Sequence, residues 1–159
     1  YIWIMAFQRS TLFSLTVFSF GLMVASGCAK DKFTTRPQLE FKEVADYTVA
    51  RGGLIKFTLQ VTDKEGDLTD SIFIATKTTR CTASNRQLKY LMPPFPITAN
   101  SKAEIEITFV NGQFVPGYVA LPGPACGRPD TTTFYFWIRD KAKNVSDTVQ
   151  TDQPLIILN

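Results

Sequence analysis

The fold class of this chain is decided by residues 54–62, which read Leu54-Ile55-Lys56-Phe57-Thr58-Leu59-Gln60-Val61-Thr62. Apolar side chains stand at Ile55, Phe57, Leu59 and Val61, with polar side chains between them. Because successive side chains of a strand point to opposite faces, this alternation predicts a strand with one face in a core and one in water. Gly52-Gly53 directly before it predicts the turn into the strand.

Strand signals recur along the rest of the chain. Alternation returns at residues 103–109 and ends at the turn-forming pair Asn111-Gly112. Residues 71–76 contain a continuous apolar run, and residues 133–139 carry aromatic side chains on both strand faces, which predicts strands deep in the fold. Weaker signals lie at 39–44, 145–149 and 155–158, the second of these as the return strand of a hairpin through residues 141–144. About seven short strands predict an all-β, antiparallel two-sheet sandwich.

Two segments interrupt this pattern. Residues 80–100 and 110–130 are rich in proline or glycine, so we expect them to lack regular structure. They carry four aromatic residues, Tyr90, Phe95, Phe114 and Tyr118. Those rings either present an aromatic platform to a sugar or a partner protein, or cover the edges of the sandwich.

The N-terminal region has the pattern of an export signal. Arg9 precedes an uncharged apolar stretch over residues 11–25, and Ser26-Gly27-Cys28 follows. A helix over that stretch would span roughly 22 Å, less than the ~30 Å hydrocarbon core of a bilayer, which favours a secretory signal peptide over a permanent membrane span.

Ala25-Ser26-Gly27-Cys28 resembles the lipobox that ends a bacterial lipoprotein signal, with Ala25 where leucine is usual. The resemblance implies cleavage before Cys28, lipidation of Cys28, and a lipid anchor in the outer membrane of the cell envelope. Soluble export after ordinary cleavage and an uncleaved anchor remain the alternatives. The expected organisation is a signal peptide over residues 1–27, a polar tether over 28–37 and one domain over 38–159.

Composition restricts the chemistry of this domain. The formal net charge is only +3, so we expect no nucleic-acid partner. Histidine is absent, which removes the usual general base, the common nucleophile triads and most zinc sites. With Cys28 assigned to lipid, Cys81 and Cys126 form an even pair in an oxidising compartment, and we expect a disulfide between them. Two free thiols are the alternative.

Residues 57–68 and 137–147 resemble Ig-like (fibronectin- or cadherin-like) domains of Bacteroidetes-type exported lipoproteins. The shared features are an acidic Gly66-Asp67-Leu68 turn and an Asp-x-x-x-Asn-x-Ser turn at residues 140–146. The resemblance implies an Ig-like sandwich of about seven strands and says little about function.

An Ig-type topology would bring these two acidic turns to the same end of the sandwich. Asp63, Glu65, Asp67 and Asp70 would then lie near Asp140 and Asn144, and clustered oxygen atoms are the ligands that Ca²⁺ requires. The alternative is that these residues only suit turns, with Lys64, Lys141 and Lys143 pairing their charges. No other cofactor is expected.

Together these features predict a membrane-anchored lipoprotein that acts as a non-catalytic binding and interaction module, with a protein or glycan partner. The alternative function is a structural accessory subunit of an outer-membrane assembly. A hydrolase that uses carboxylates alone ranks third; Glu104 and Glu106 share a strand face, but a glycosidase pair needs a cleft. Exposed aromatics in one patch would favour the first function, and an uncovered apolar sheet face the second.

Overall fold

The computed structural model describes residues 34–93 and 98–159. The expected signal peptide, the lipidated Cys28, most of the tether and Phe95 therefore lie outside the described residues. Within the described ranges, no helix has the length and apolar character needed to cross a membrane.

Ten strands and one short 3-10 helix form the described part of the chain. In chain order they are β1 (Gln38–Val44), β2 (Thr48–Val49), β3 (Leu54–Asp63), β4 (Ser71–Thr78), η2 (Thr82–Ser84), β5 (Arg86–Leu91), β6 (Ser101–Asn111), β7 (Val119–Leu121), β8 (Asp130–Arg139), β9 (Val149–Gln150) and β10 (Leu155–Ile157).

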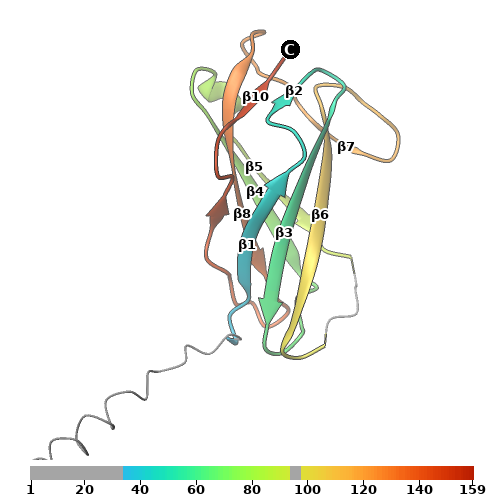
Figure 1. Ribbon diagram of the computed structural model, residues 1–159, viewed down its shortest axis with the longest axis vertical. Coiled ribbons are helices and arrows are strands. Elements are labelled where there is room, and N and C mark those ends of the chain that lie inside the picture. Colours follow the sequence, from blue (N-terminus) through green and yellow to red (C-terminus); the bar gives the residue numbers. More distant parts are fainter. Residues whose placement is uncertain (1–33, 94–97) are drawn as a thin grey trace, which may run out of the picture. The chain divides into compact units, whose positions relative to one another are not determined.

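The strands form two sheets that face each other (Figure 1). The first has the order β1-β3-β6-β7, and the second has the order β2-β10-β8-β4-β5, with β9 also paired to β8. The predicted all-β, two-sheet sandwich is confirmed.

The core lies between the inward faces of β3 and β8. On β3, the alternate residues Ile55, Phe57, Leu59 and Val61 are fully buried, as the sequence pattern predicted. The Phe57 ring lies 4.8 Å from that of Phe134 and 5.0 Å from that of Phe136, both on β8. Tilted and edge-to-face aromatic contacts of this kind add to the free energy gained from burial of apolar area.

Strand β8 is central in its sheet, between β10 and β4, but only one of its faces lies in the core. Phe134, Phe136 and Ile138 are fully buried, whereas Tyr135 and Trp137 on the other face are half-buried. The prediction that residues 133–139 lie deep therefore holds for every second residue.

The expectation that residues 80–100 and 110–130 lack regular structure was wrong for part of each. Strand β5 lies in the first segment and pairs antiparallel with β4, and β7 lies in the second and pairs parallel with β6. β5 and β7 have only short strand patterns of their own in the sequence. They form strands because the edges of β4 and β6 supply their hydrogen bonds.

Two further details differ from the sequence-based expectation. Asn111-Gly112 does not open a hairpin: Gly112 adopts φ 61° and the chain returns as the parallel strand β7. After β8, Val145 makes only an isolated bridge with Arg139, and regular pairing resumes at β9. The parallel pairs β6–β7 and β10–β2 are additions to an otherwise antiparallel sandwich.

Candidate functional site

Three carboxylates meet at one end of the sandwich. Asp63 is the last residue of β3, Asp67 follows in the turn toward β4, and Asp140 directly follows β8. Each offers a carboxylate oxygen within 4.8 Å of the other two. Asp63 and Asp140 are fully buried, and Asp67 is partly exposed. We call these three residues the acidic cluster.

The β3–β4 turn forms around Asp63. Its Oδ2 accepts hydrogen bonds from the backbone N–H groups of Gly66 at 2.6 Å and Asp67 at 3.2 Å. Gly66 adopts φ 75°, a conformation that glycine takes without steric strain. Asp63 Oδ1 is buried and has no hydrogen-bond partner among the described residues.

The turn after β8 forms around Asp140 in the same way. Its carboxylate accepts hydrogen bonds from the Asn144 backbone N–H at 2.7 Å and from Asn144 Nδ2 at 2.8 Å. The two turns also contact each other: Lys141 N–H donates to the backbone oxygen of Asp67 at 3.0 Å, and Ala142 N–H donates to Asp67 Oδ2 at 3.3 Å. Asn144 therefore orients a carboxylate of the cluster.

The charge of the acidic cluster is not neutralised by the ion pairs of the described residues. None of those pairs includes Asp63, Asp67 or Asp140. At an effective dielectric of about 20, two unit charges separated by no more than 4.8 Å repel by at least about 3.5 kcal/mol. Burial raises the pKa of Asp67, and the charges of Asp140 and Asp63 raise it further.

The remaining predicted ligands lie elsewhere. Asp70 forms ion pairs with Arg139 at 2.6 Å and Lys143 at 3.3 Å, and the Arg139 guanidinium is the main cause of its lowered pKa. Glu65 is exposed on the surface of the β3–β4 turn. The expected pairing of Lys143 with an acidic residue therefore occurs, but at Asp70 and not within the acidic cluster.

The aromatic residues of the two interrupting segments divide between surface and core. Phe114 is 78% exposed and Tyr118 is 44% exposed, next to Val119 at 45%. Tyr90 instead packs on Phe109, with ring centroids 5.8 Å apart, and burial raises its pKa. The interpretation that such rings cover the sandwich therefore holds for Tyr90 and not for Phe114.

A second surface feature was missed at the sequence level. On the outward face of β4 and β8, the rings of Phe73 and Trp137 stack in parallel, with centroids 5.4 Å apart. Lys89 Nζ lies 5.9 Å and Arg139 Cζ 5.7 Å from the centre of the Phe73 ring. We call Phe73 and Trp137 with these two cations the sheet-face stack. The aromatic residues at alternate positions within residues 133–139 are the sequence pattern from which this outward-facing stack could have been predicted.

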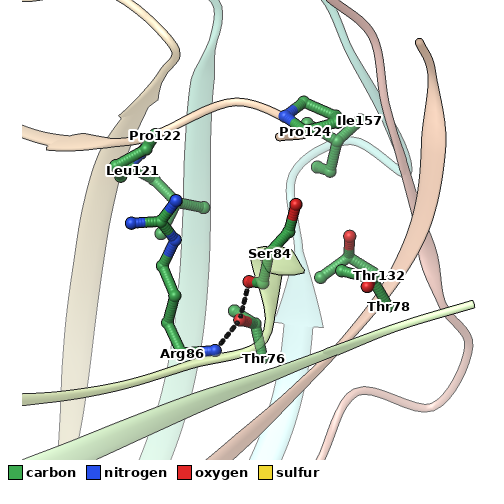
Figure 2. Close-up of a pocket in the computed structure, with 9 residues that line it drawn as sticks. All are labelled: Thr76, Thr78, Ser84, Arg86, Leu121, Pro122, Pro124, Thr132 and Ile157. Carbon is green, nitrogen blue, oxygen red and sulfur yellow. Dashed lines mark hydrogen bonds between the residues drawn. The ribbon is translucent and has the colours of Figure 1, made fainter. Parts of the chain in front are cut away.

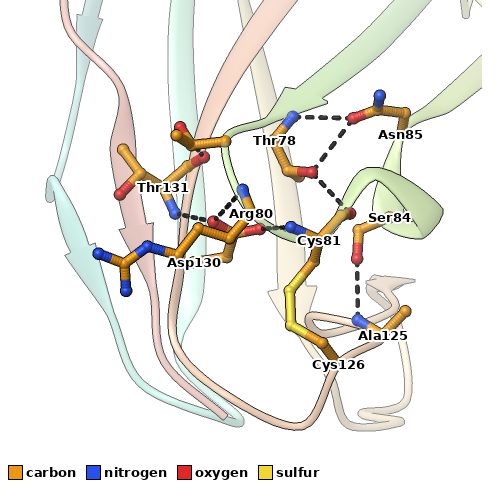
Figure 3. Close-up of a disulfide and its surroundings, with 10 residues drawn as sticks. Thr78, Arg80, Cys81, Ser84, Asn85, Ala125, Cys126, Asp130 and Thr131 are labelled. Carbon is orange, nitrogen blue, oxygen red and sulfur yellow. Dashed lines mark hydrogen bonds between the residues drawn. A yellow bond between two sulfur atoms is a disulfide. The ribbon is translucent and has the colours of Figure 1, made fainter.

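Cys81 and Cys126 form the predicted disulfide, with Cα atoms 5.8 Å apart (Figure 3). The buried Asp130 supports Cys81 on its other side. Its carboxylate accepts hydrogen bonds from the backbone N–H groups of Cys81 at 2.7 Å, Arg80 at 3.1 Å and Thr131 at 2.8 Å. Burial alone would raise the pKa of Asp130, but these donors hold it below its ordinary value.

A cavity beside this disulfide is too small for an organic substrate. Figure 2 shows it between the Thr76 and Ser84 side chains and the prolines at 122 and 124, and its volume is about 20 Å³. That volume suits a single water molecule. Thr76 Oγ1 donates to Ser84 O at 3.1 Å and accepts from Arg86 N–H at 3.0 Å, so these polar groups already satisfy one another.

Glu104 and Glu106 lie on the solvent-exposed face of a strand. Both are exposed on β6, and Glu106 forms an ion pair with Lys56 on the neighbouring strand at 2.6 Å. In the acidic cluster, Asp63 and Asp140 have no exposed surface through which a substrate could approach.

No protein-family model and no curated sequence matches the chain. One solved structure that resembles it is the crystal structure of Spo0M, a sporulation control protein from Bacillus subtilis, with 8% identity and a TM-score of 0.45. The match covers 79% of this chain and 51% of that protein, so the chain spans about half the length of Spo0M.

Proposed function

We propose that this chain is a non-catalytic binding and interaction module, tethered through a lipid on Cys28 to the outer membrane of the cell envelope. The observation that carries the proposal is the exposure of Phe114, which leaves 78% of its surface in water. Burial of a phenylalanine side chain is worth about 1.5–3 kcal/mol, and aromatic residues are enriched among those that dominate binding.

The segment that carries Phe114 is held firmly at both ends. Gly112 N–H donates to Leu121 O at 2.7 Å and closes the loop across its base. The buried Asn111 side chain donates to Val49 O at 3.3 Å and Leu158 O at 2.8 Å. These bonds attach the end of β6 to β2 and to the segment that follows β10. A loop fixed at its base loses little conformational entropy when its tip binds, which favours a binding role.

The proposed partner is a protein with an apolar pocket that receives Phe114 and the neighbouring Tyr118. A side chain that projects from a loop suits insertion into a pocket. The absence of histidine, the water-sized cavity and the inaccessible carboxylates of Asp63 and Asp140 support a role without catalysis.

The sheet-face stack supports a second candidate function, a structural accessory subunit of an outer-membrane assembly. Trp137 and Phe73 remain half-buried on an outward sheet face. Aromatic residues there would pack against a flat partner surface, whereas Phe114 would enter a pocket.

Site-specific photo-crosslinking in intact cells tests the two functions against each other. A benzophenone amino acid is placed at 114, at 137 or, as a control on an exposed strand face, at 104. We expect one discrete crosslinked protein from position 114 and none from 104. Crosslinks from 137 alone would support the structural subunit, and crosslinks from neither position would contradict both functions.

The anchor needs a separate test because it depends on residue 28 alone. Radiolabelled palmitate should label the wild-type protein, and Cys28→Ser should abolish labelling and release the protein from the membrane fraction. Membrane association that survives Cys28→Ser would contradict the lipid anchor and favour an uncleaved N-terminal segment.

A further inference from the structure

We propose that Asp63, Asp67 and Asp140 bind a Ca²⁺ ion that joins the β3–β4 turn to the turn after β8. Two independent observations carry this proposal. The three carboxylates offer oxygen atoms within 4.8 Å of one another, and the fully buried Asp63 has an oxygen, Oδ1, without a hydrogen-bond partner among the described residues.

The distances fit a shared ion. Oxygens that bind one Ca²⁺ at 2.3–2.6 Å lie no more than about 5 Å apart, and the three carboxylates meet this limit without movement of the backbone. An all-oxygen set suits a hard cation, and the chain has no histidine that would favour zinc or copper.

The unpartnered oxygen separates this cluster from an ordinary turn. In the turn, Asp63 Oδ2 already accepts the backbone hydrogen bonds that the local conformation needs. Oδ1 makes no hydrogen bond in that turn, yet it is buried away from water, in a carboxylate that lies close to two others. Buried polar atoms are seldom left without a partner, and a cation would satisfy this one.

The surrounding charges leave the cluster free for a cation. Arg139 and Lys143 both pair with Asp70, and Arg36, which also contacts the turn after β8, pairs with Asp147. Asn144 donates to both oxygens of Asp140 and orients it, so it acts as a positioning residue for the ion and not as a ligand. Glu65 is exposed and outside the cluster.

Thermal melting of the full-length protein in EDTA, in CaCl₂ and in MgCl₂ tests the site. The variants are Asp67→Asn, which removes one charge from the partly exposed member, and Glu65→Gln, a matched control that removes a carboxylate from the same turn. We expect millimolar Ca²⁺ to raise the melting temperature of the wild type and of Glu65→Gln by several degrees, with a smaller rise in Mg²⁺.

Asp67→Asn should separate metal binding from turn formation. Relative to the wild type, it should raise the melting temperature in EDTA and lower it in Ca²⁺. In EDTA its melting temperature should exceed that of the wild type, since the substitution relieves carboxylate repulsion, and Ca²⁺ should raise its melting temperature much less than that of the wild type. Calorimetric titration should show one Ca²⁺ site in the wild type, weakened at least tenfold in Asp67→Asn. A wild type that is indifferent to Ca²⁺, equal stabilisation by Mg²⁺, or an Asp67→Asn variant that is destabilised equally in EDTA and Ca²⁺ would each overturn the proposal.

Discussion

Opening the disulfide by Cys126→Ser should remove a large share of the stability of the domain. The bridge closes a loop with a sequence separation of 45 residues. The chain-entropy relation gives about 4 kcal/mol for a loop of that length, against a total of roughly 5–15 kcal/mol for an ordinary domain. Cys126 is exposed whereas Cys81 is only 4% exposed, so substitution at 126 leaves core packing intact.

Urea unfolding followed by the fluorescence of Trp137 measures this loss. With a slope of about 2 kcal/mol per molar urea, the midpoint should fall by about 2 M, and the slope should rise somewhat because the open chain exposes more surface on unfolding. Reduced wild-type protein should reproduce the midpoint of Cys126→Ser. Cys28→Ser, which leaves the bridge intact, should unfold at the wild-type midpoint.

A midpoint shift below about 0.5 M would contradict the predicted role of the bridge. Closing a loop of this length should contribute far more free energy of unfolding than so small a shift represents. A similar loss in Cys28→Ser would also contradict that role, since that residue takes no part in the bridge. Hydrogen exchange gives a local check: residues 122–129 should exchange faster in Cys126→Ser, while the turns around the acidic cluster keep their protection.

Four further substitutions test the packing and the buried polar contacts. Phe57→Ala should destabilise the domain by about 3–5 kcal/mol in chemical unfolding, because Phe57 is fully buried between two β8 rings, whereas Phe114→Ala should change stability by less than about 0.5 kcal/mol. Asn111→Ala should lower stability by about 1–3 kcal/mol, measured in the same way, because two backbone oxygens lose their donor. Asp130→Asn should destabilise at neutral pH. Because the folded-state pKa of Asp130 is lowered, its stabilisation is complete above the unfolded value of about 3.9 and is lost as pH falls through the folded value. Unfolding curves of the two proteins should therefore converge below about pH 4, and a difference independent of pH would contradict the role of the charge.

The sequence by itself determined the fold class and the inward face of its main strand. Alternation of period two is a local property, so residues 54–62 specify which side chains point inward before any partner strand is known. The Cys81–Cys126 disulfide was also predicted, because the assignment of Cys28 to lipid left a single pair. The shared acidic end of the sandwich followed from the topology that the resemblance implied.

Only the tertiary structure decided which acidic residues form a cluster. Asp63, Glu65, Asp67 and Asp70 lie within eight residues and look alike in the sequence. Arg139 engages Asp70, Glu65 faces water, and the packing of the ends of β3 and β8 buries Asp63 against Asp140. Burial and ion pairing depend on neighbours distant in the chain, so no local pattern could have separated these four carboxylates.

The same physical reason accounts for the missed strands. β5 and β7 are short, and their hydrogen bonds come from the edges of β4 and β6, which the local sequence does not reveal. The sheet-face stack depends in turn on the register that sets Phe73 opposite Trp137. The formation of the long alternating strands and the choice of their core-facing side chains are local consequences of the amino-acid order, whereas strand pairing and direction, burial and charge compensation arise only when distant segments pack together.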